Sequence, residues 1–264
     1  MELSHQLIPQ LKHLRLSGIL ETLEHRQQEA IQQKWSYTDF LQRLLEDEVE
    51  RRGQKQLALR LRRAGLNSTK TLETFDFDFN PSINRQQLVH LAESEYVRQH
   101  RNVILCGPTG TGKSHLGQAL AQEACRKGFQ ALFIPVDKLL KHLHGGRADD
   151  SWDRRLQTYL RPDVLILDDF GLKPLTPPAP EDLYDLINER YEQGSIILTS
   201  NRAPAEWPEL FGDPLLASAG LDRLAHRAEM IVLRGASYRA KDRKKLEQEP
   251  LTDPVQETEG DLST

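Results

Sequence analysis

Apolar residues at the start of the chain recur at intervals of three and four, the spacing that places them on one face of a helix. In the first segment these positions are Leu3, Leu7, Leu11, Leu14, Ile19 and Leu23. Ser36 and Asp39 then resemble a capping box, with Asp in place of the usual Glu, and predict the start of a second helix. The apolar stripe of that helix consists of Phe40, Leu41, Leu44, Leu45 and Val49. Leu57 and Leu61 predict a third helix that ends near Gly65, which completes a small helical domain.

The pattern changes after residue 66. The run Phe75-Asp76-Phe77-Asp78-Phe79-Asn80-Pro81 has no helical spacing, so we interpret residues 67–81 as an extended linker that lays aromatic side chains on the next domain. Residues 86–99 predict a helix, and short β-type runs then alternate with helical patterns. The predicted strands are residues 102–106, 131–135, 163–168, 195–200 and 229–233. This alternation predicts an α/β fold in which a parallel five-stranded sheet is flanked by helices.

Charge adds a fourth region to this organisation. The 264 residues carry a formal net charge of −4, but the last 18 contain six carboxylates and no Lys or Arg. Without that segment the chain has a formal charge of +2. The acidity of the segment and its scarcity of apolar residues predict disorder. The predicted divisions are a small helical domain (1–66), the aromatic linker (67–81), an α/β domain (82–246) and an acidic disordered tail (247–264).

The chain lacks the signals of a membrane or secreted protein. No apolar run approaches 18 residues, and the N-terminus has no signal-peptide pattern. The two cysteines, Cys106 and Cys125, make no disulfide framework and are interpreted as reduced, packed thiols. We therefore expect a cytoplasmic protein without membrane association.

One glycine-rich segment carries the strongest chemical signal. It reads Gly107-Pro108-Thr109-Gly110-Thr111-Gly112-Lys113-Ser114 and lies between a predicted strand and a helical pattern. Its glycines let backbone N–H groups point at one spot, Lys113 supplies positive charge for the β- and γ-phosphates, and Ser114 offers a hydroxyl to Mg²⁺. We predict a nucleoside triphosphate site here. His115 is counted among the residues around it, with a position on the helix surface as the alternative.

Two further strands end in polar side chains that would meet this loop at the same sheet edge. Asp168 and Asp169 end the third strand; the first suits the metal or its waters, and the second is placed to orient or polarise the attacking water. Asn201 follows the fourth strand and is placed to hydrogen-bond the water or the γ-phosphate. A plain strand end is the alternative in each case.

Three arginines in the last part of the chain are candidates for contacting the γ-phosphate. Arg223 is our choice for stabilising transition-state charge, a role that a neighbouring subunit can supply. Arg227 is the second choice, and a solvated helix face is the alternative. Arg239 follows the last strand and either senses nucleotide in its own chain or belongs to a basic segment that faces DNA; the spacing leaves both open.

Together these motifs resemble the AAA+ ATPases, and more narrowly the DnaA/DnaC branch of initiators and helicase loaders. From about residue 5 to 240 the chain is similar to the IstB family, the helper ATPases of insertion-sequence transposition. The resemblance rests on the phosphate loop together with Glu48-Val49-Glu50-Arg51-Arg52, Phe75-Asp76-Phe77, Asp168-Asp169-Phe170-Gly171, Thr199-Ser200-Asn201, Glu206-Trp207, Asp222-Arg223-Leu224 and Ser237-Tyr238-Arg239. Asp169 stands where many AAA+ proteins have Glu, which this branch permits.

The resemblance implies partners and roles that spacing does not show. Family members resemble AAA+ switches that oligomerise on duplex DNA with ATP between subunits, and that help a separate transposase of the IstA type to engage target DNA without cutting it. The implied roles are phosphate and Mg²⁺ binding for Lys113 and Ser114, an acidic pair in Asp168 and Asp169, a sensor in Asn201 and an arginine finger in Arg223. The segment after about residue 246 departs from the family pattern.

A basic segment is the expected DNA contact. Its members are Arg51, Arg52, Lys55, Arg60, Arg62 and Arg63. No Asp or Glu lies among residues 51–63, although a solvated surface is the alternative. Phosphate contacts release counterions and read no bases, so we expect salt-sensitive binding to duplex DNA with weak sequence preference.

The leading hypothesis is an oligomeric, DNA-stimulated ATPase that assists a transposase. A DnaC-type replicative helicase loader is the alternative, because its ATPase core would look nearly the same and its N-terminal helices would grip a helicase. A small-molecule phosphotransferase would need a substrate lid and no basic strips.

Overall fold

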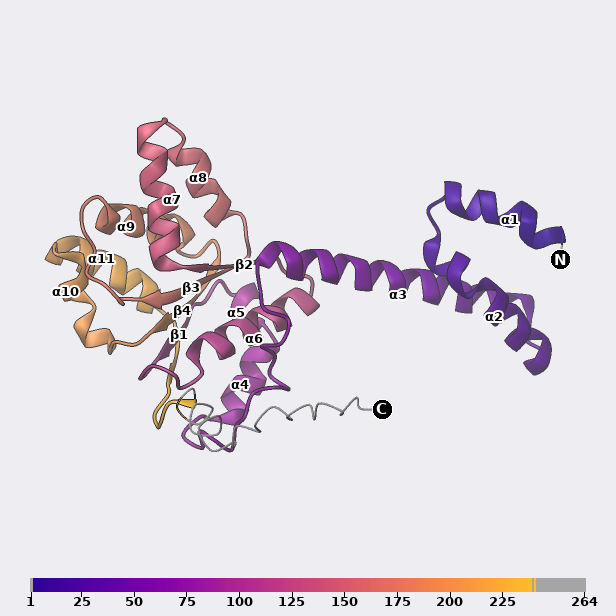
Figure 1. Cartoon of the computed structure of the whole chain (residues 1–264), viewed down its shortest axis with the longest axis horizontal. Coiled ribbons are helices and arrows are strands. Elements are labelled where there is room, and N and C mark those ends of the chain that lie inside the picture. The colour runs from indigo at the N-terminus through magenta and orange to yellow at the C-terminus, as the bar shows by residue number, and fades with distance from the viewer. Residues whose placement is uncertain (1, 239, 241–264) are drawn as a thin grey trace, which may run out of the picture.

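The computed structural model describes residues 2–238 and 240, and it consists of an N-terminal helical arm joined to an α/β domain (Figure 1). The α-helices are α1 (Glu2–His13), α2 (Ser17–Gln33), α3 (Tyr37–Ala64), α4 (Arg85–Ala92), α5 (Glu95–Arg98), α6 (Lys113–Arg126), α7 (Val136–Ala148), α8 (Trp152–Leu160), α9 (Ala179–Arg190), α10 (Pro208–Phe211) and α11 (Pro214–Ala225). The strands are β1 (Val103–Cys106), β2 (Ala131–Pro135), β3 (Val164–Phe170), β4 (Ser195–Ser200) and β5 (Glu229–Val232), and a 3-10 helix, η1 (Pro204–Glu206), precedes α10. Within the described part of the chain, every helix is too short or too polar to span a membrane.

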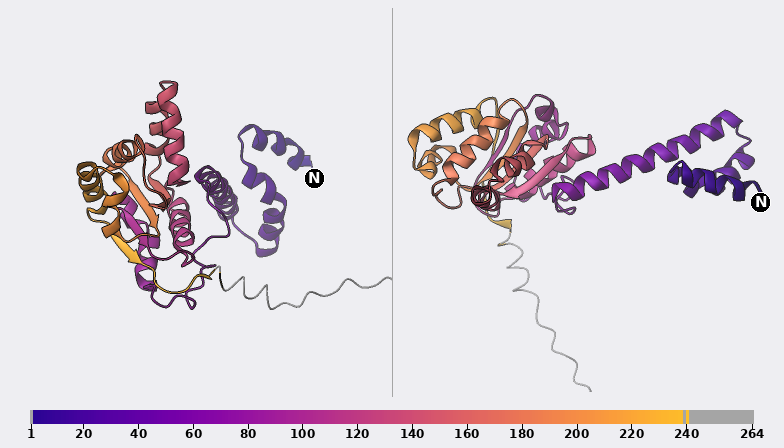
Figure 2. Two further views of the ribbon diagram at one scale, coloured as in Figure 1. Left: turned by 60° about the vertical axis from the view of Figure 1, so that its left-hand side comes forward. Right: turned by 90° about the horizontal axis from the view of Figure 1, so that it is seen from above.

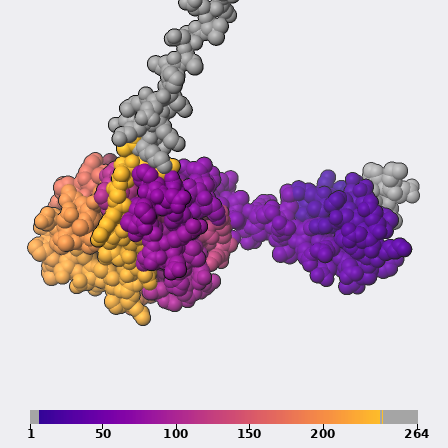
Figure 3. Space-filling view, turned by 90° about the horizontal axis from the view of Figure 1, so that it is seen from below, coloured from indigo at the N-terminus to yellow at the C-terminus, as the bar shows by residue number. Residues whose placement is uncertain are grey.

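One helix of 28 residues, α3, stands where the sequence predicted two separate helices. Ser36 begins it with the predicted capping box: the Ser36 hydroxyl accepts from Asp39 N at 3.2 Å, and Ser36 N donates to the Asp39 carboxylate at 3.3 Å. The helix continues through Gly53 and ends at Gly65, whose φ of 66° is the left-handed conformation that favours glycine. The two apolar stripes therefore belong to one element, and this element forms the narrow neck between the two lobes in Figure 3.

The first half of α3 packs against α2 in a close helical pair (Figure 2). A Cβ at Gly18 would lie 2.7 Å from backbone atoms of Asp47 and Glu48, so the close approach requires glycine. The buried Glu48 carboxylate accepts hydrogen bonds from Gly18 N at 2.6 Å and Ile19 N at 3.3 Å, and Arg52 Nε donates to its other oxygen at 2.6 Å. Burial opposes ionisation, but these hydrogen bonds outweigh it and lower the pKa of Glu48. An ionised carboxylate on one helix thus caps the first turn of its neighbour.

The second half of α3 packs on the α/β domain. Leu57 and Leu61 lie against its core, and Ala64 is fully buried in it. Phe75 and Phe77 of the linker pack on the same core, which confirms the predicted role of the linker aromatics. Because both lobes share α3, the predicted division into domains stays a prediction.

The sheet confirms the predicted fold class. Five parallel strands follow the order β2-β3-β4-β1-β5. Strand β3 runs two residues beyond its predicted end, to Phe170. The single helix predicted for residues 86–99 is wrong: α4 and α5 take its place, because Ser94 between them has a left-handed φ of 60°.

Alternate side chains of each strand point to opposite faces of the sheet. In β1, Val103 and Leu105 pack with α4, α5, α6 and the end of α3, whereas Ile104 and Cys106 pack with the α7 to α11 side (Figure 1). Both faces are covered, which explains why the strands are almost continuously apolar.

A buried arginine ties together the amino ends of β3 and β4. Arg190, the last residue of α9, is 2 % exposed. Its guanidinium donates to the backbone carbonyls of Tyr159, Leu160, Pro162, Asp163 and Ser195. Burial lowers the pKa of Arg190 to about 10, so the group remains protonated at neutral pH. One side chain therefore anchors the turn before β3 to the start of β4.

Candidate nucleotide-binding site

The phosphate loop, residues 107–114, connects β1 to α6 as the sequence predicted. Gly107 has a φ of 148°, and a Cβ there would lie 2.2 Å from Leu233 O. Gly112 has a φ of 98°, and a Cβ there would lie 2.6 Å from the Phe75 ring. Both positions require glycine, because packed neighbours and backbone conformation each exclude a side chain.

The ammonium group of Lys113 lies within the curl of this loop. Lys113 Nζ donates to the carbonyl oxygens of Gly107 and Pro108, each at 2.7 Å, and the side chain is buried. Thr111 Oγ1 donates to the same Pro108 oxygen at 2.9 Å. The ammonium and the amino end of α6 thus place positive charge at one point, as polyphosphate binding requires.

The acidic pair at the end of β3 is held by a threonine that the sequence did not single out. Thr199 Oγ1 is buried in β4 and donates to Asp168 Oδ1 at 2.6 Å. Thr199 Oγ1 in turn accepts a hydrogen bond from Asp169 N at 3.0 Å. Asp169 has a left-handed φ of 59° and its side chain is exposed, so the chain turns at this point and separates the two carboxylates. Asp168 is buried and Asp169 faces outward.

Apart from Arg223, the polar residues predicted for catalysis meet in one pocket of about 330 Å³. It is lined by Lys113, Ser114, Asp169 and Asn201, and Asp168 precedes Asp169 in β3. The second carboxylate oxygen of Asp168 accepts no hydrogen bond from any described residue. A serine hydroxyl and a carboxylate oxygen are the hard ligands that Mg²⁺ prefers, so these residues fit the implied ion.

The linker and the segment after β5 form the other wall of this pocket. From the linker the lining residues are Lys70, Thr74, Phe75, Asp76, Phe79 and Asn80. Tyr238 closes the wall: its backbone N donates to Gly110 O at 2.9 Å, and its ring meets the Phe79 ring edge-on at 5.0 Å. The Phe-Asp repeat pointed to packing on the next domain, but nothing in its pattern indicated a place beside the phosphate loop.

A row of polar side chains on α6 anchors the linker. The buried Gln118 accepts a hydrogen bond from Asn67 N at 3.0 Å, and Gln122 Nε2 donates to Asn67 O at 2.9 Å and Lys70 O at 2.8 Å. His115 belongs to this row, with Nε2 at 2.8 Å from Thr71 O. A carbonyl only accepts, so Nε2 carries the ring proton.

His115 therefore lines the pocket but contacts the linker. Burial lowers its pKa, partly offset by the Thr71 hydrogen bond, and its ring lies edge-on to Phe75 at 5.2 Å. The side chain is partly buried on the surface of α6, where it contacts Thr71 and Phe75 of the linker, so its place among the nucleotide-binding residues stays a prediction.

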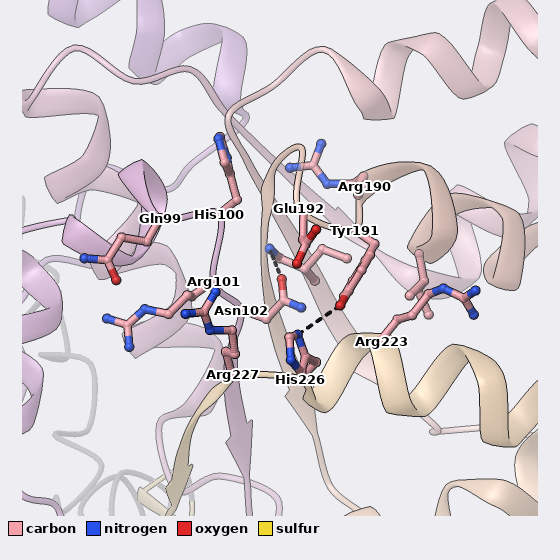
Figure 4. A pocket seen from close by; sticks show the side chains of 12 residues that line it. Gln99, His100, Arg101, Asn102, Arg190, Tyr191, Glu192, Arg223, His226 and Arg227 are labelled. Carbon is pink, nitrogen blue, oxygen red and sulfur yellow. Dashed lines mark hydrogen bonds between the residues drawn. The ribbon is translucent and has the colours of Figure 1, made fainter.

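Arg223 lies at the opposite edge of the sheet. With residues 99–102, which precede β1, and Ile196 at the start of β4, it lines a cavity of about 20 Å³ (Figure 4). Arg223 Nη1 donates to Ala219 O at 3.0 Å, and the guanidinium lies 5.6 Å from the centre of the Tyr184 ring. The phosphate loop follows the other end of β1, so Arg223 cannot reach a nucleotide in its own chain.

The second arginine candidate, Arg227, shares this edge and has a left-handed φ of 56° (Figure 4). Arg239 lies outside the described residues, as do the remaining basic residues after it and the predicted acidic tail. Neither open role of Arg239 is therefore decided by the fold.

The structure divides the predicted DNA-binding residues of α3 into two groups. Arg51 pairs with Glu21, Arg52 with Glu48, and Arg60 donates to Cys125 O at 3.0 Å. The second group is exposed or partly exposed and forms no ion pair with a described residue: Lys55, Arg62 and Arg63. Arg51, Lys55 and Arg62 lie on one helical face. Arg62 follows Lys55 by seven residues and Arg51 by eleven, and both intervals are close to whole numbers of helical turns.

Comparison with known proteins agrees with this site. The family model for the IstB-like ATP binding protein matches residues 9–246. A putative ATP-binding protein in an insertion sequence of Mycobacterium tuberculosis is 42% identical over 234 residues, covering 88% of this chain and 93% of that protein. The insertion sequence IS21 putative ATP-binding protein of Pseudomonas aeruginosa is 39% identical, covering 91% of each chain.

Two solved structures share the fold. The DnaC helicase loader superposes with a TM-score of 0.55 at 22% identity, over 63% of this chain and 98% of that one. The replication initiator DnaA, bound to AMPPCP and single-stranded DNA, gives a TM-score of 0.54 at 23% identity, over 71% of this chain and 58% of that one. At this identity their likeness shows only that the fold is shared. The family match and the insertion-sequence relatives show in addition to which family the chain belongs. This chain belongs to the family of IstB-like ATP-binding proteins.

Proposed function

We propose that this protein is a DNA-stimulated ATPase that assembles on duplex DNA in the cytoplasm and helps a partner transposase of the IstA type to select and engage target DNA. The insertion-sequence context of its relatives supports the connection to transposition. Lys55, Arg62 and Arg63 of α3, which form no ion pair with a described residue, support contact with phosphates.

The observation that carries the proposal is the separation of the catalytic residues between two edges of one sheet. Lys113, Asp169 and Asn201 line the pocket at the carboxyl edge, while Arg223 lies at the amino edge. Among the described residues of a single chain, no arginine lines the nucleotide pocket. If the amino edge of one chain meets the pocket of the next, each assembled pair gains a complete site, and this supports ATP-dependent self-association.

Within such a site the residues divide the work of hydrolysis. Mg²⁺, held by Ser114 and by Asp168 directly or through its waters, would neutralise phosphate charge when bound. Lys113 holds the β- and γ-phosphates, and Asp169 accepts a hydrogen bond from the attacking water. Asn201 orients that water or the γ-phosphate. Arg223 of the next chain stabilises the charge that develops during transfer.

The decisive experiment mixes two inactive variants. Arg223→Ala should retain ATP affinity and lose turnover, and Lys113→Ala should lose ATP binding. In a mixture, a Lys113→Ala chain still presents Arg223 to the intact pocket of an Arg223→Ala chain. We therefore expect the mixture to recover up to about a quarter of wild-type ATPase activity in random pairs, measured as phosphate release with duplex DNA present.

The outcomes separate the possibilities clearly. Full activity of Arg223→Ala would remove this arginine from the mechanism, and recovery in the mixture is impossible if the arginine acts within its own chain. Arg154→Ala is the matched control, since Arg154 is an exposed arginine of the same domain.

The same preparation tests the assigned process. Target selection predicts that the protein changes where a purified IstA-type transposase inserts its DNA, and that Lys113→Ala abolishes the change. The DnaC likeness is one of fold alone, and retention on a hexameric replicative helicase instead of the transposase would favour the helicase-loader alternative.

A further inference from the structure

A basic groove beside the neck of the molecule remains without a role. It measures about 440 Å³ and lies between the last turns of α3, the start of β2 and the turn before β3. We call it the α3 groove. Its apolar floor includes Leu59, Leu132 and Pro162, and its rim carries Arg60, Arg63 and Arg161.

The described residues that line the α3 groove include three arginines and no carboxylate. Among the described residues, Arg60 donates to Cys125 O, and neither Arg63 nor Arg161 forms an ion pair. The adjacent Asp163 is not among the lining residues, and its Oδ2 accepts a hydrogen bond from Gln130 N at 2.7 Å. A cleft lined by one sign of charge attracts the opposite sign. Because the floor is apolar, the best occupant carries carboxylates and apolar side chains together, which the sugar-phosphate backbone of DNA does not.

The chain itself contains a segment of this composition. Residues 249–255 read Glu249-Pro250-Leu251-Thr252-Asp253-Pro254-Val255, within a stretch of six carboxylates that has no Lys or Arg. Leu251 and Val255 suit the floor of the groove, and the flanking carboxylates suit its rim. The two prolines reduce the number of conformations that the free segment loses on binding.

The segment is long enough to reach the groove in its own chain. The described chain leaves the phosphate loop near Tyr238, at the carboxyl edge of the sheet, and the groove lies at the amino end of β2. Strand geometry puts about 17 Å along β2 and about 14 Å across three strands between these points. The eleven residues from 241 to 251 span up to about 36 Å when extended, which allows a path around the domain.

We propose that residues 247–264 dock in the α3 groove of the same chain and compete with DNA for the basic end of α3. Arg60 and Arg63 belong both to the groove and to the predicted DNA-binding residues, so the two ligands exclude each other. The docking itself does not depend on the proposed function, but its effect on DNA does. Because the segment is tethered, it binds at an effective concentration near the millimolar range, and DNA must compete with this intramolecular ligand.

Photo-cross-linking in the full-length protein tests the docking directly. Leu251 is replaced by p-benzoylphenylalanine, and cross-linked peptides of the monomer are identified by mass spectrometry. We expect intramolecular cross-links to residues 56–63 or 128–132 or 158–162, reduced at least tenfold by Arg161→Gln. Arg161 is exposed and its side chain makes no hydrogen bond to a described residue, so the fold should survive this change. Arg154→Gln, which removes the same charge from the exposed surface of α8, should leave the cross-links unchanged.

DNA binding gives an independent readout. With all six tail carboxylates changed to amides, we expect at least fivefold tighter binding to duplex DNA at low salt. In the protein with the wild-type tail, Arg161→Gln should strengthen DNA binding, because it releases the tail from the α3 groove. In the protein with the six amide substitutions, Arg161→Gln should no longer strengthen DNA binding. Scattered cross-links, or equal effects of Arg161→Gln and Arg154→Gln, would overturn the docking. Cross-links at the groove with no DNA binding by any variant would instead refute the proposed function and leave the docking intact.

Discussion

Thr199 offers the sharpest test of how the acidic pair is built. Its hydroxyl bridges Asp168 Oδ1 at 2.6 Å and Asp169 N at 3.0 Å, and the residue is fully buried. Thr199→Val keeps the shape of the side chain and removes only the hydroxyl. Asp168 would lose the donor that orients it toward the pocket, and Asp169 would lose the acceptor that holds its amide in the turn.

The size of the effect follows from the charged hydrogen bond. A hydrogen bond to an ionised group contributes about 1.5–3 kcal/mol, and about 1.4 kcal/mol corresponds to a factor of ten. If that free energy is lost from the Mg²⁺ site, the Mg²⁺ concentration that gives half-maximal ATPase activity should rise by about 10- to 150-fold. Binding of nucleotide without metal should change little, because the contacts of Lys113 with the phosphate loop are separate from this bridge.

The assay titrates Mg²⁺ at saturating ATP and, in parallel, titrates a fluorescent ATP analogue in EDTA. Thr199→Ser retains the hydroxyl and is the matched control; we expect it to stay within about threefold of wild type. Wild-type Mg²⁺ dependence in Thr199→Val would show that the bridge does not position Asp168. An equal loss of metal-free nucleotide binding would show that the substitution disturbs the whole pocket, which contradicts a specific role.

Three further outcomes are expected. Gly112→Ala should weaken nucleotide binding by at least about tenfold, because a left-handed φ costs about 1–2 kcal/mol for other residues and the new Cβ would lie 2.6 Å from the Phe75 ring. The double variant with Phe75→Ala should recover part of the lost affinity. Equal affinities of Gly112→Ala and the wild type in fluorescent-nucleotide titrations would contradict the steric argument. Glu48→Gln should destabilise the packing of α2 on α3 by about 1.5–3 kcal/mol at pH 7, measured by urea unfolding. Hydrogen bonding lowers the folded-state pKa of Glu48 despite burial, so its stabilising effect is complete above the unfolded-state pKa near 4.5 and is lost as the pH falls through the folded-state pKa. The wild type should therefore lose more stability than the variant between pH 6 and pH 3. Parallel losses of stability would refute the assignment. Arg190→Met should lower stability by about 3–5 kcal/mol and the melting temperature by roughly 6–20 °C, since backbone carbonyls lose their buried donor, and a calorimetric change below about 2 °C would show that water replaces it.

The sequence by itself determined the elements whose signals are local. The phosphate loop requires glycines at fixed positions, the capping box needs two residues three apart, and buried parallel strands read as continuous apolar runs. The five strands, the start of α3 at Ser36 and the turn at Gly65 were all predicted for this reason. The order of the motifs along an α/β chain also placed Asp169 and Asn201 at the edge that holds Lys113, because the carboxyl ends of parallel strands share one edge.

Only the tertiary structure decided what happens between segments far apart in the chain. The two apolar stripes of α3 pack against different partners but lie on one helix. Apolar periodicity shows which face of a helix is buried, but it does not show that one helix packs in two lobes. Thr199 and Glu48 hydrogen-bond to residues about 30 positions away in the sequence, and Arg190 donates to carbonyls of two separate segments. No local sequence pattern therefore indicates these contacts. The basic strip of α3 was divided in the same way: a run of like charges looks uniform in sequence, but Arg60 reaches a carbonyl of α6 and Arg63 does not. Local stereochemistry can be read from neighbouring residues, whereas the partner of a buried charge or hydroxyl exists only once the chain has folded.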